Sequence, residues 1–186
     1  MEYILLAGPI LFIVITIILG QITPNYSHKE NYISELSLGK YGLIQKINFM
    51  VSGLLISGLG LFIATYSQNL VIKLGWGLAI IAGFLLVLTG IWDTDYDKPK
   101  RTMSGRIHDS IYNFMMPTTG VAYLLLGWGH KNNPIILILS WLIALSSFVL
   151  YKFSKKIGLK HGLSQRIVFF SAAVWMEILA IISIFK

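Results

Sequence analysis

The chain has 186 residues, of which 55% are hydrophobic and 12% are charged, with a formal net charge of +7. This composition is typical of an integral membrane protein and excludes a freely soluble domain. The absence of cysteine excludes disulfides, thiolate nucleophiles and cysteine-ligated zinc or iron–sulfur centres. The length allows one domain, because no polar stretch between the apolar segments is long enough to fold alone.

Six segments are apolar enough to cross the bilayer, since a span needs about 20 apolar residues for about 30 Å of hydrocarbon. We predict these spans at roughly 3–22, 47–66, 74–92, 110–128, 134–153 and 167–185. The fold class predicted is all-α: a polytopic membrane protein, with residues 1–186 forming one compact bundle of six transmembrane helices. The first segment lacks the basic leader and the cleavage site of a signal peptide, so we expect it to be retained.

Lysine and arginine gather on one side of the expected spans. The first, third and fifth connections, with their flanks, hold twelve of these residues, and the opposite side holds three. Basic residues mark cytoplasmic loops. We therefore expect these three connections in the cytoplasm, both termini outside, and a multi-pass location in the cell membrane. Because the cations flank spans, we expect contacts with anionic lipid headgroups and no nucleic acid partner.

The first connection contains the stretch NYISELSLG, residues 31 to 39, whose apolar residues have helical spacing. This spacing predicts a short helix at the membrane interface, which would carry Ser34 and Glu35 beside the third connection. Asn48, just inside the second span, would lie near the same cytoplasmic opening of the bundle, which we call the polar mouth, and would hydrogen-bond across helices. We predict all three as substrate-binding residues. Interfacial anchoring alone is the alternative explanation of this connection.

The third connection, residues 90 to 109, places aspartates at three alternate positions before a histidine. Asp93 ends the third span, Asp95 and Asp97 follow it, and His108 begins the next helix at a similar depth. A histidine paired with a carboxylate can act as a general acid or base, or it can simply bridge two helices. We predict His108 and Asp93 as catalytic residues and no cofactor. The alternative is Mg²⁺ held by Asp93 and Asp95, although alternate aspartates in loops are more often capping residues.

Spacing along the fourth helix adds two substrate-binding candidates. His108 and Tyr112 share one helix face by i to i+4 spacing, and Asp109 and Asn113 share the next. We therefore predict that Tyr112 and Asn113 line the same mouth as His108.

The last span contains an ionisable residue, Glu177, in an apolar setting. It follows Arg166 by eleven residues, about 16 Å along a helix, which is too far for a direct ion pair. An ionisable group at this depth indicates a functional site, here a catalytic acid or polar anchor. The alternative is a neutral glutamic acid that hydrogen-bonds to a neighbouring helix.

Short motifs in this chain resemble one family. YISELS, NF followed by Gly53, GIWD and SGRIHD are similar to the bacterial membrane proteins grouped as domain of unknown function number 998, and more distantly to FRAG/DRAM-type polytopic proteins. The resemblance extends from about Leu5 to Ile184 and implies a compact six-helix or similar bundle. It implies that Ser34, Glu35, Asn48, Asp93 and His108 occupy the family's recurring polar positions, all of which the expected topology places near the cytoplasmic face. The residues IW before Asp93 and the extra Asp95 and Asp97 depart from the family pattern, which weakens a family-wide metal role.

These observations favour a lipid-facing enzyme or lipid-binding protein whose polar mouth holds a lipid or isoprenoid headgroup. His108 and Asp93 would transfer protons, and Glu177 would act deeper, with isoprenoid cyclisation as one concrete version. A proton-coupled small transporter would use Glu177 and His108 as relay stations. A noncatalytic assembly or accessory protein would use the same residues to lock helices together. The expected partners are membrane lipids and a hydrophobic small molecule, and a protein partner stays open.

Overall fold

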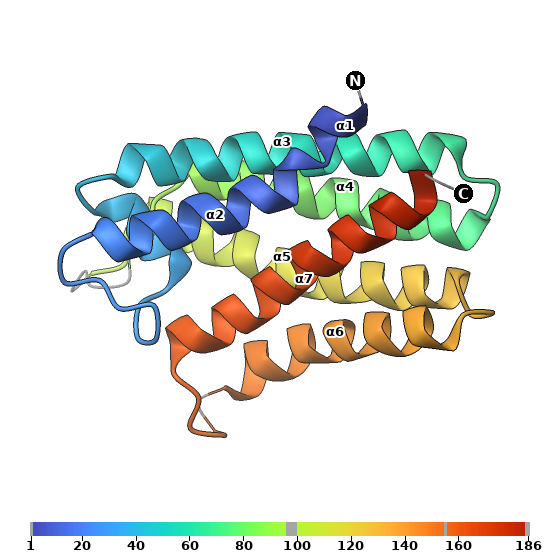
Figure 1. Cartoon of the computed structure of the whole chain (residues 1–186). Coiled ribbons are helices and arrows are strands. Elements are labelled where there is room, and N and C mark those ends of the chain that lie inside the picture. The colour runs from blue at the N-terminus through green and yellow to red at the C-terminus, as the bar shows by residue number, and fades with distance from the viewer. Residues whose placement is uncertain (1, 96–99, 155, 185–186) are drawn as a thin grey trace.

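The computed structural model describes residues 2–95, 100–154 and 156–184, and within these ranges the regular elements are all helices, with no strand (Figure 1). In chain order the elements are α1 (Glu2–Leu5), α2 (Ala7–Ile22), the 3-10 helix η1 (Ile33–Leu38), α3 (Gly42–Tyr66), α4 (Leu70–Ile91), α5 (Met103–Gly129), α6 (Pro134–Phe153) and α7 (His161–Ile184). The all-α fold class is confirmed.

Four stretches of helix are long and apolar enough to cross a membrane: Tyr3–Ile22, Gly42–Tyr66, Leu70–Ile91 and His161–Ile184. α6 contributes a shorter apolar stretch, Pro134–Leu150. α5 is long, but polar and small residues such as Asn113, Thr118 and Gly120 lower its mean hydropathy.

Several helices begin earlier than the expected spans. α3, α4, α5 and α7 start four to seven residues before positions 47, 74, 110 and 167, because hydropathy marks the apolar part of a helix and not its polar first turns. Side-chain caps fix two of these starts. Asn69 Oδ1 accepts hydrogen bonds from the backbone N–H groups of Val71 and Ile72, at 2.9 and 3.3 Å. Thr102 Oγ1 accepts from Gly105 N at 3.1 Å.

Small residues let α3 and α4 approach closely along their length. A Cβ atom added to Gly53 would lie 2.5 Å from the carbonyl oxygen of Gly83, and Ser57 Oγ donates to the carbonyl oxygen of Ile80 at 3.0 Å. In lipid, helix association depends on such close packing and interhelical hydrogen bonds. These contacts hold the two helices in close packing.

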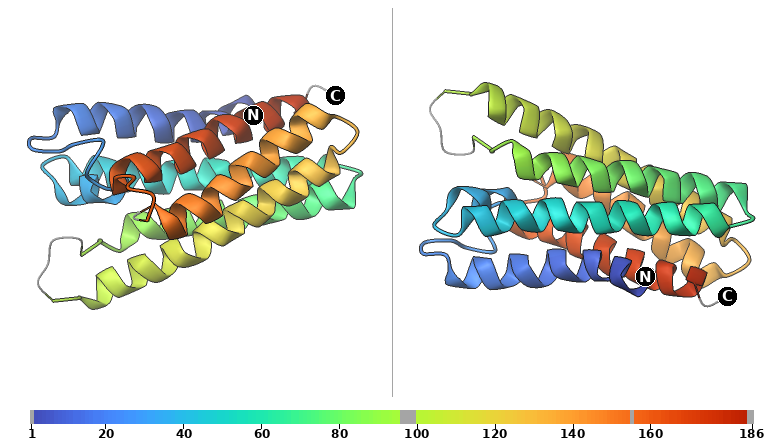
Figure 2. Two further views of the ribbon diagram at one scale, coloured as in Figure 1. Left: turned by 90° about the horizontal axis from the view of Figure 1, so that it is seen from below. Right: turned by 90° about the horizontal axis from the view of Figure 1, so that it is seen from above.

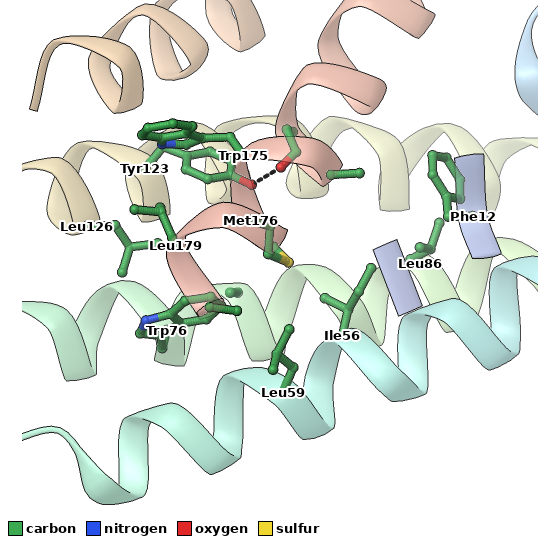
Figure 3. Close-up of a cluster of buried hydrophobic side chains, with 14 of the residues drawn as sticks. Phe12, Ile56, Leu59, Trp76, Leu86, Tyr123, Leu126, Trp175, Met176 and Leu179 are labelled. Carbon is green, nitrogen blue, oxygen red and sulfur yellow. Dashed lines mark hydrogen bonds between the residues drawn. The ribbon is translucent and has the colours of Figure 1, made fainter. Parts of the chain in front are cut away.

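α7 runs diagonally across one face of the bundle, between α2 and α6 (Figures 1 and 2). Large side chains fill the space behind it, among them Trp76, Tyr123 and Met176 (Figure 3). Tyr123 donates a hydrogen bond from its hydroxyl to the carbonyl oxygen of Ala172, and Trp175 Nε1 donates to Ser140 Oγ at 2.8 Å. The diagonal helix is therefore tied to both α5 and α6.

The described parts of three connections, residues 23–41, 92–95 with 100–102, and 154 with 156–160, lie together at one end of the bundle, which we call the basic end (Figure 1). The connections at 67–69 and 130–133 lie at the opposite end, toward which both termini also point. The up-and-down order of the helices thus brings the three lysine- and arginine-rich connections together.

Candidate functional site

The helix η1 folds over the basic end of the bundle, where it contacts α2, α3 and α7. Ile33 and Leu36 are buried, with 2% and 1% of their surfaces exposed. Ile33 N donates to Gln165 Oε1 at 2.6 Å, which joins η1 to α7. The first connection is therefore docked on the bundle, as a site at this end requires.

The Glu35 side chain forms hydrogen bonds within the first connection. Its carboxylate accepts hydrogen bonds from Tyr32 N and from Asn31 Nδ2, both at 2.7 Å. The first of these belongs to a capping box at the start of η1. The structure places Glu35 as a residue that shapes the connection, outside the lining of the pockets described below.

Arg166 fastens the connection to α7 from within. Its side chain is 7% exposed, and Nε donates to His28 Nδ1 at 3.1 Å. Nη1 donates to the carbonyl oxygens of Asn31 and Gly162, both at 3.0 Å, and Nη2 donates to the Tyr26 hydroxyl.

The Arg166 charge also affects the pKa values of its two ring neighbours. Burial raises the pKa of Tyr26, against the opposing effect of the Arg166 charge. Burial, and then the Arg166 charge, lower the pKa of His28. Both residues are thereby favoured in their neutral forms beside the cation.

A polar pocket of about 210 Å³ opens between α5, α6, α7 and the first connection. Its lining consists of Tyr32, Asp109, Tyr112, Asn113, Leu150, Ser154, His161 and Ser164. The rings of Tyr32 and His161 stack with centroids 5.2 Å apart. The Asp109 carboxylate forms an ion pair with Arg101. The pocket therefore offers hydroxyl, amide and imidazole groups beside a paired carboxylate.

Tyr112 also lines a second, narrower pocket of about 20 Å³, the Ser34–His108 pocket. Its other lining residues are mainly apolar and come from η1, which supplies Ser34, and from α2, α3, α4, α5 and α7. His108 is 6% exposed, and its Nδ1 lies 2.8 Å from the carbonyl oxygen of Trp92. Because a carbonyl oxygen accepts only, Nδ1 carries the proton, which leaves Nε2 as the acceptor of the neutral ring.

A third, central pocket of about 60 Å³ continues this cavity toward the middle of the bundle. Phe12, Leu86, Met115 and Phe169 line both the Ser34–His108 pocket and the central pocket. Figure 3 shows Phe12 and Leu86 in the same buried cluster as Met176. The three pockets thus lie in series from a polar opening to an apolar interior, and each shares lining residues with the next; we call this series the path.

The aspartates of the third connection have other described contacts. Asp93 Oδ1 lies 2.7 Å from Lys46 Nζ. The Asp95 carboxylate accepts from the backbone N–H of Thr102 and from Thr102 Oγ1, the latter at 2.8 Å, so it stabilises the start of α5. Across the described ranges, no three histidine, cysteine, aspartate or glutamate side chains are grouped as metal ligands. Asp97 lies outside these ranges.

Asn48 connects α2 and α3 and is not in the lining of the three pockets described above. Its Nδ2 lies 3.4 Å from both the carbonyl oxygen of Phe12 and Thr16 Oγ1, and its Oδ1 accepts from Ser52 Oγ at 3.1 Å. Gln45 Nε2 donates to the same Thr16 hydroxyl at 3.3 Å. This buried polar cluster fixes the relative position of the two helices.

Two further features lie away from the basic end. Glu177 is in the C-terminal half of α7 and lines none of the three pockets. The opposite end of the bundle has a larger pocket of about 520 Å³, bordered by residues such as Tyr66, His130 and Asn133. None of the residues predicted for the site lines that pocket, so the polar path at the basic end is the better candidate.

The structure therefore brings together four of the predicted residues: Ser34, His108, Tyr112 and Asn113. The sequence interpretation did not include Tyr32, His161 and Ser164 in the site. No local spacing joins them, because they meet through the docking of the first connection on α7. Asp109 could have been predicted as a site residue from the sequence, since its i to i+4 spacing from Asn113 places the two side chains on one helix face.

Apolar helices arranged in a bundle, with a polar pocket at one end, define an integral membrane protein. The family model described as "Protein of unknown function (DUF998)" matches residues 6–182, so the chain belongs to this family. The match confirms the family resemblance seen in the short motifs, whereas the more distant likeness to FRAG/DRAM-type proteins stays a prediction. Neither a curated protein nor a solved structure matches the chain significantly.

Proposed function

We propose that this protein binds an amphipathic lipid or isoprenoid at the basic end of its bundle. The headgroup occupies the polar pocket, and the chain follows the Ser34–His108 and central pockets. The observation that carries this proposal is the position of Tyr112, which lines both the polar pocket and the apolar path. Ligand sites in proteins are mostly apolar cavities with a few convergent polar groups. The flexible Met115 and Met176 side chains can move to admit a chain.

The proposed topology has six spans, with α5 and α6 crossing beside the four most apolar helices. The support is their length and packing: α5 lies between α4 and α6, and residues 110–129 contain no charged side chain. The basic end faces the cytoplasm in this topology, and both termini face outward, because lysine and arginine resist translocation. The polar pocket then opens at the cytoplasmic leaflet of the cell membrane.

The chemistry proposed for this site is proton transfer at His108. Its hydrogen bond to Trp92 directs Nε2 as the proton acceptor, and Asp93, paired with Lys46, adds negative charge nearby. Neither the Asp93 nor the Glu177 carboxyl group is in the lining of these three pockets. The geometry therefore favours removal of a proton from a bound lipid over protonation of an alkene, the step that a cyclase needs.

Native mass spectrometry of protein purified in mild detergent tests the binding proposal. Wild type should carry a stoichiometric lipid or isoprenoid, and Asn113→Leu, which fills the polar pocket, should lose it. Asn132→Leu, at the opposite end, is the matched control and should keep the ligand. Bulk phospholipid alone, equal in all three proteins, would overturn the proposal.

A noncatalytic assembly or accessory role is the second candidate. The Asn48 cluster and the Arg166 contacts favour it, because both use polar residues to join helices and loops. Under that role, substitutions at His108 and Asn113 change folding or complex formation without displacing any small molecule. The same ligand measurement, accompanied by thermal unfolding, separates the two candidates.

A further inference from the structure

Glu177 has an unsatisfied polar atom in a membrane-spanning helix. It lies seven residues before the end of α7, about 10 Å along the axis. Its Oε2 is buried, and it has no hydrogen-bond partner in the described part of the chain. In hydrocarbon, a polar group without a partner is costly, and a charged one is costlier still. Because the residue as a whole is only half-buried and its carboxyl group can turn about the last side-chain bond, a partner outside the described chain can satisfy this oxygen.

Glu177 also lies within a regular stripe on α7. Its members follow alternating steps of three and four residues: Ile167, Phe170, Val174, Glu177 and Ile181. Val174 and Ile181, on either side of Glu177, are 51% and 42% exposed, and Ile167 is exposed as well. Phe170 and Glu177 are half-buried. Such alternation is the spacing by which two helices pack along a shared seam.

We propose that α7 forms a dimer interface with α7 of a second copy of this chain, in which the two Glu177 side chains hydrogen-bond to each other. All copies of a membrane protein insert in the same orientation, so the two α7 helices run parallel about a two-fold axis. In a parallel pair, each seam residue faces its own counterpart. In the dimer, Ile167, Val174 and Ile181 then each pack against the same residue of the second copy.

A second copy fits this surface because a neutral carboxylic acid is self-complementary. It offers one O–H donor and one carbonyl acceptor, so two such groups related by a two-fold axis satisfy each other. Interhelical hydrogen bonds of this kind support helix association in lipid. This dimer does not depend on the proposed lipid site, because Glu177 lines none of its pockets.

The number of subunits in lipid bilayers tests the proposal, measured by single-molecule photobleaching over a dilution series. Wild type should be dimeric. Glu177→Gln, whose amide still donates and accepts, should remain dimeric, whereas Glu177→Leu should raise the dimer dissociation constant at least tenfold. A wild type that is monomeric at all dilutions, or a Glu177→Leu variant as dimeric as wild type, would overturn the proposal.

Disulfide cross-linking tests the seam directly, because the chain has no native cysteine. Val174→Cys and Ile181→Cys, each with Glu177 intact, should form covalent dimers under mild oxidation. Leu61→Cys on α3, equally outward-facing at 60% exposure, is the control and should not. This measurement stands even if Glu177→Leu does not fold. Equal cross-linking at all three positions would indicate random collision and contradict the seam.

Discussion

Tyr32 and His161 stack with ring centroids 5.2 Å apart, although 129 residues separate them in sequence. This contact joins the first connection to the start of α7 and forms one wall of the polar pocket. An aromatic pair contributes about 1 kcal/mol beyond its buried area. We expect His161→Ala to lower both thermal stability and the occupancy of the bound lipid, whereas His161→Phe, which keeps a ring, should preserve stability. Equal ligand occupancy in wild type and His161→Ala would contradict this role.

Arg166 is expected to be the most sensitive residue of the first connection. Arg166→Met removes the three hydrogen bonds that join Tyr26, His28 and Asn31 to α7. Hydrogen bonds to charged groups contribute about 1.5–3 kcal/mol each, so a loss of about 3 kcal/mol or more in unfolding free energy is expected. Arg166→Lys should not rescue the loss, because an ammonium group cannot reproduce the guanidinium geometry. Lys156→Met, an exposed cation, is the control, and an equal effect of both substitutions would contradict the prediction.

The stability of the first connection should depend on pH through His28. Its pKa is lowered in the folded protein by burial and by the Arg166 charge. Between the lowered value and the ordinary value of 6.5, the unfolded chain binds a proton that the folded chain does not. Stability from this group is therefore complete above pH 6.5 and falls as the pH decreases toward the lowered pKa. Thermal unfolding from pH 8 to pH 5 should show a shallower decline in His28→Gln than in wild type. Parallel curves would sink the prediction.

Asn48 distinguishes a packing role from a ligand-binding role. Asn48→Leu removes the contacts with Thr16 and Ser52 inside the bundle, and leaving such polar groups unpaired costs about 1–3 kcal/mol. We expect a lower midpoint of thermal unfolding, with unchanged lipid occupancy in the folded fraction. Loss of ligand at unchanged stability would instead support the substrate-binding role predicted from the sequence.

The helices could be predicted from the sequence because each apolar run is long and local. α6 has the expected bounds, while α5 begins seven residues early because Thr102 and Asp95 stabilise a polar first turn. Helical spacing also placed His108 with Tyr112 and Asp109 with Asn113 on the correct faces. The remaining contacts depend on tertiary packing: Asp93 pairs with Lys46, and Gln165 Oε1 accepts a hydrogen bond from Ile33 N. No spacing within one helix encodes such contacts between elements.

The central claim is that an amphipathic ligand lies along the path from the polar pocket to the interior, and photo-crosslinking tests it most directly. A long-chain lipid probe with a diazirine in the chain is incubated with the protein in bilayers, and labelled residues are mapped by peptide sequencing. The account predicts labelling of Met115, Phe169 and Met176, which line the inner pockets, and loss of that labelling in Asn113→Leu. Labelling confined to outward-facing residues such as Phe84 and Leu142, unchanged by Asn113→Leu, would contradict it.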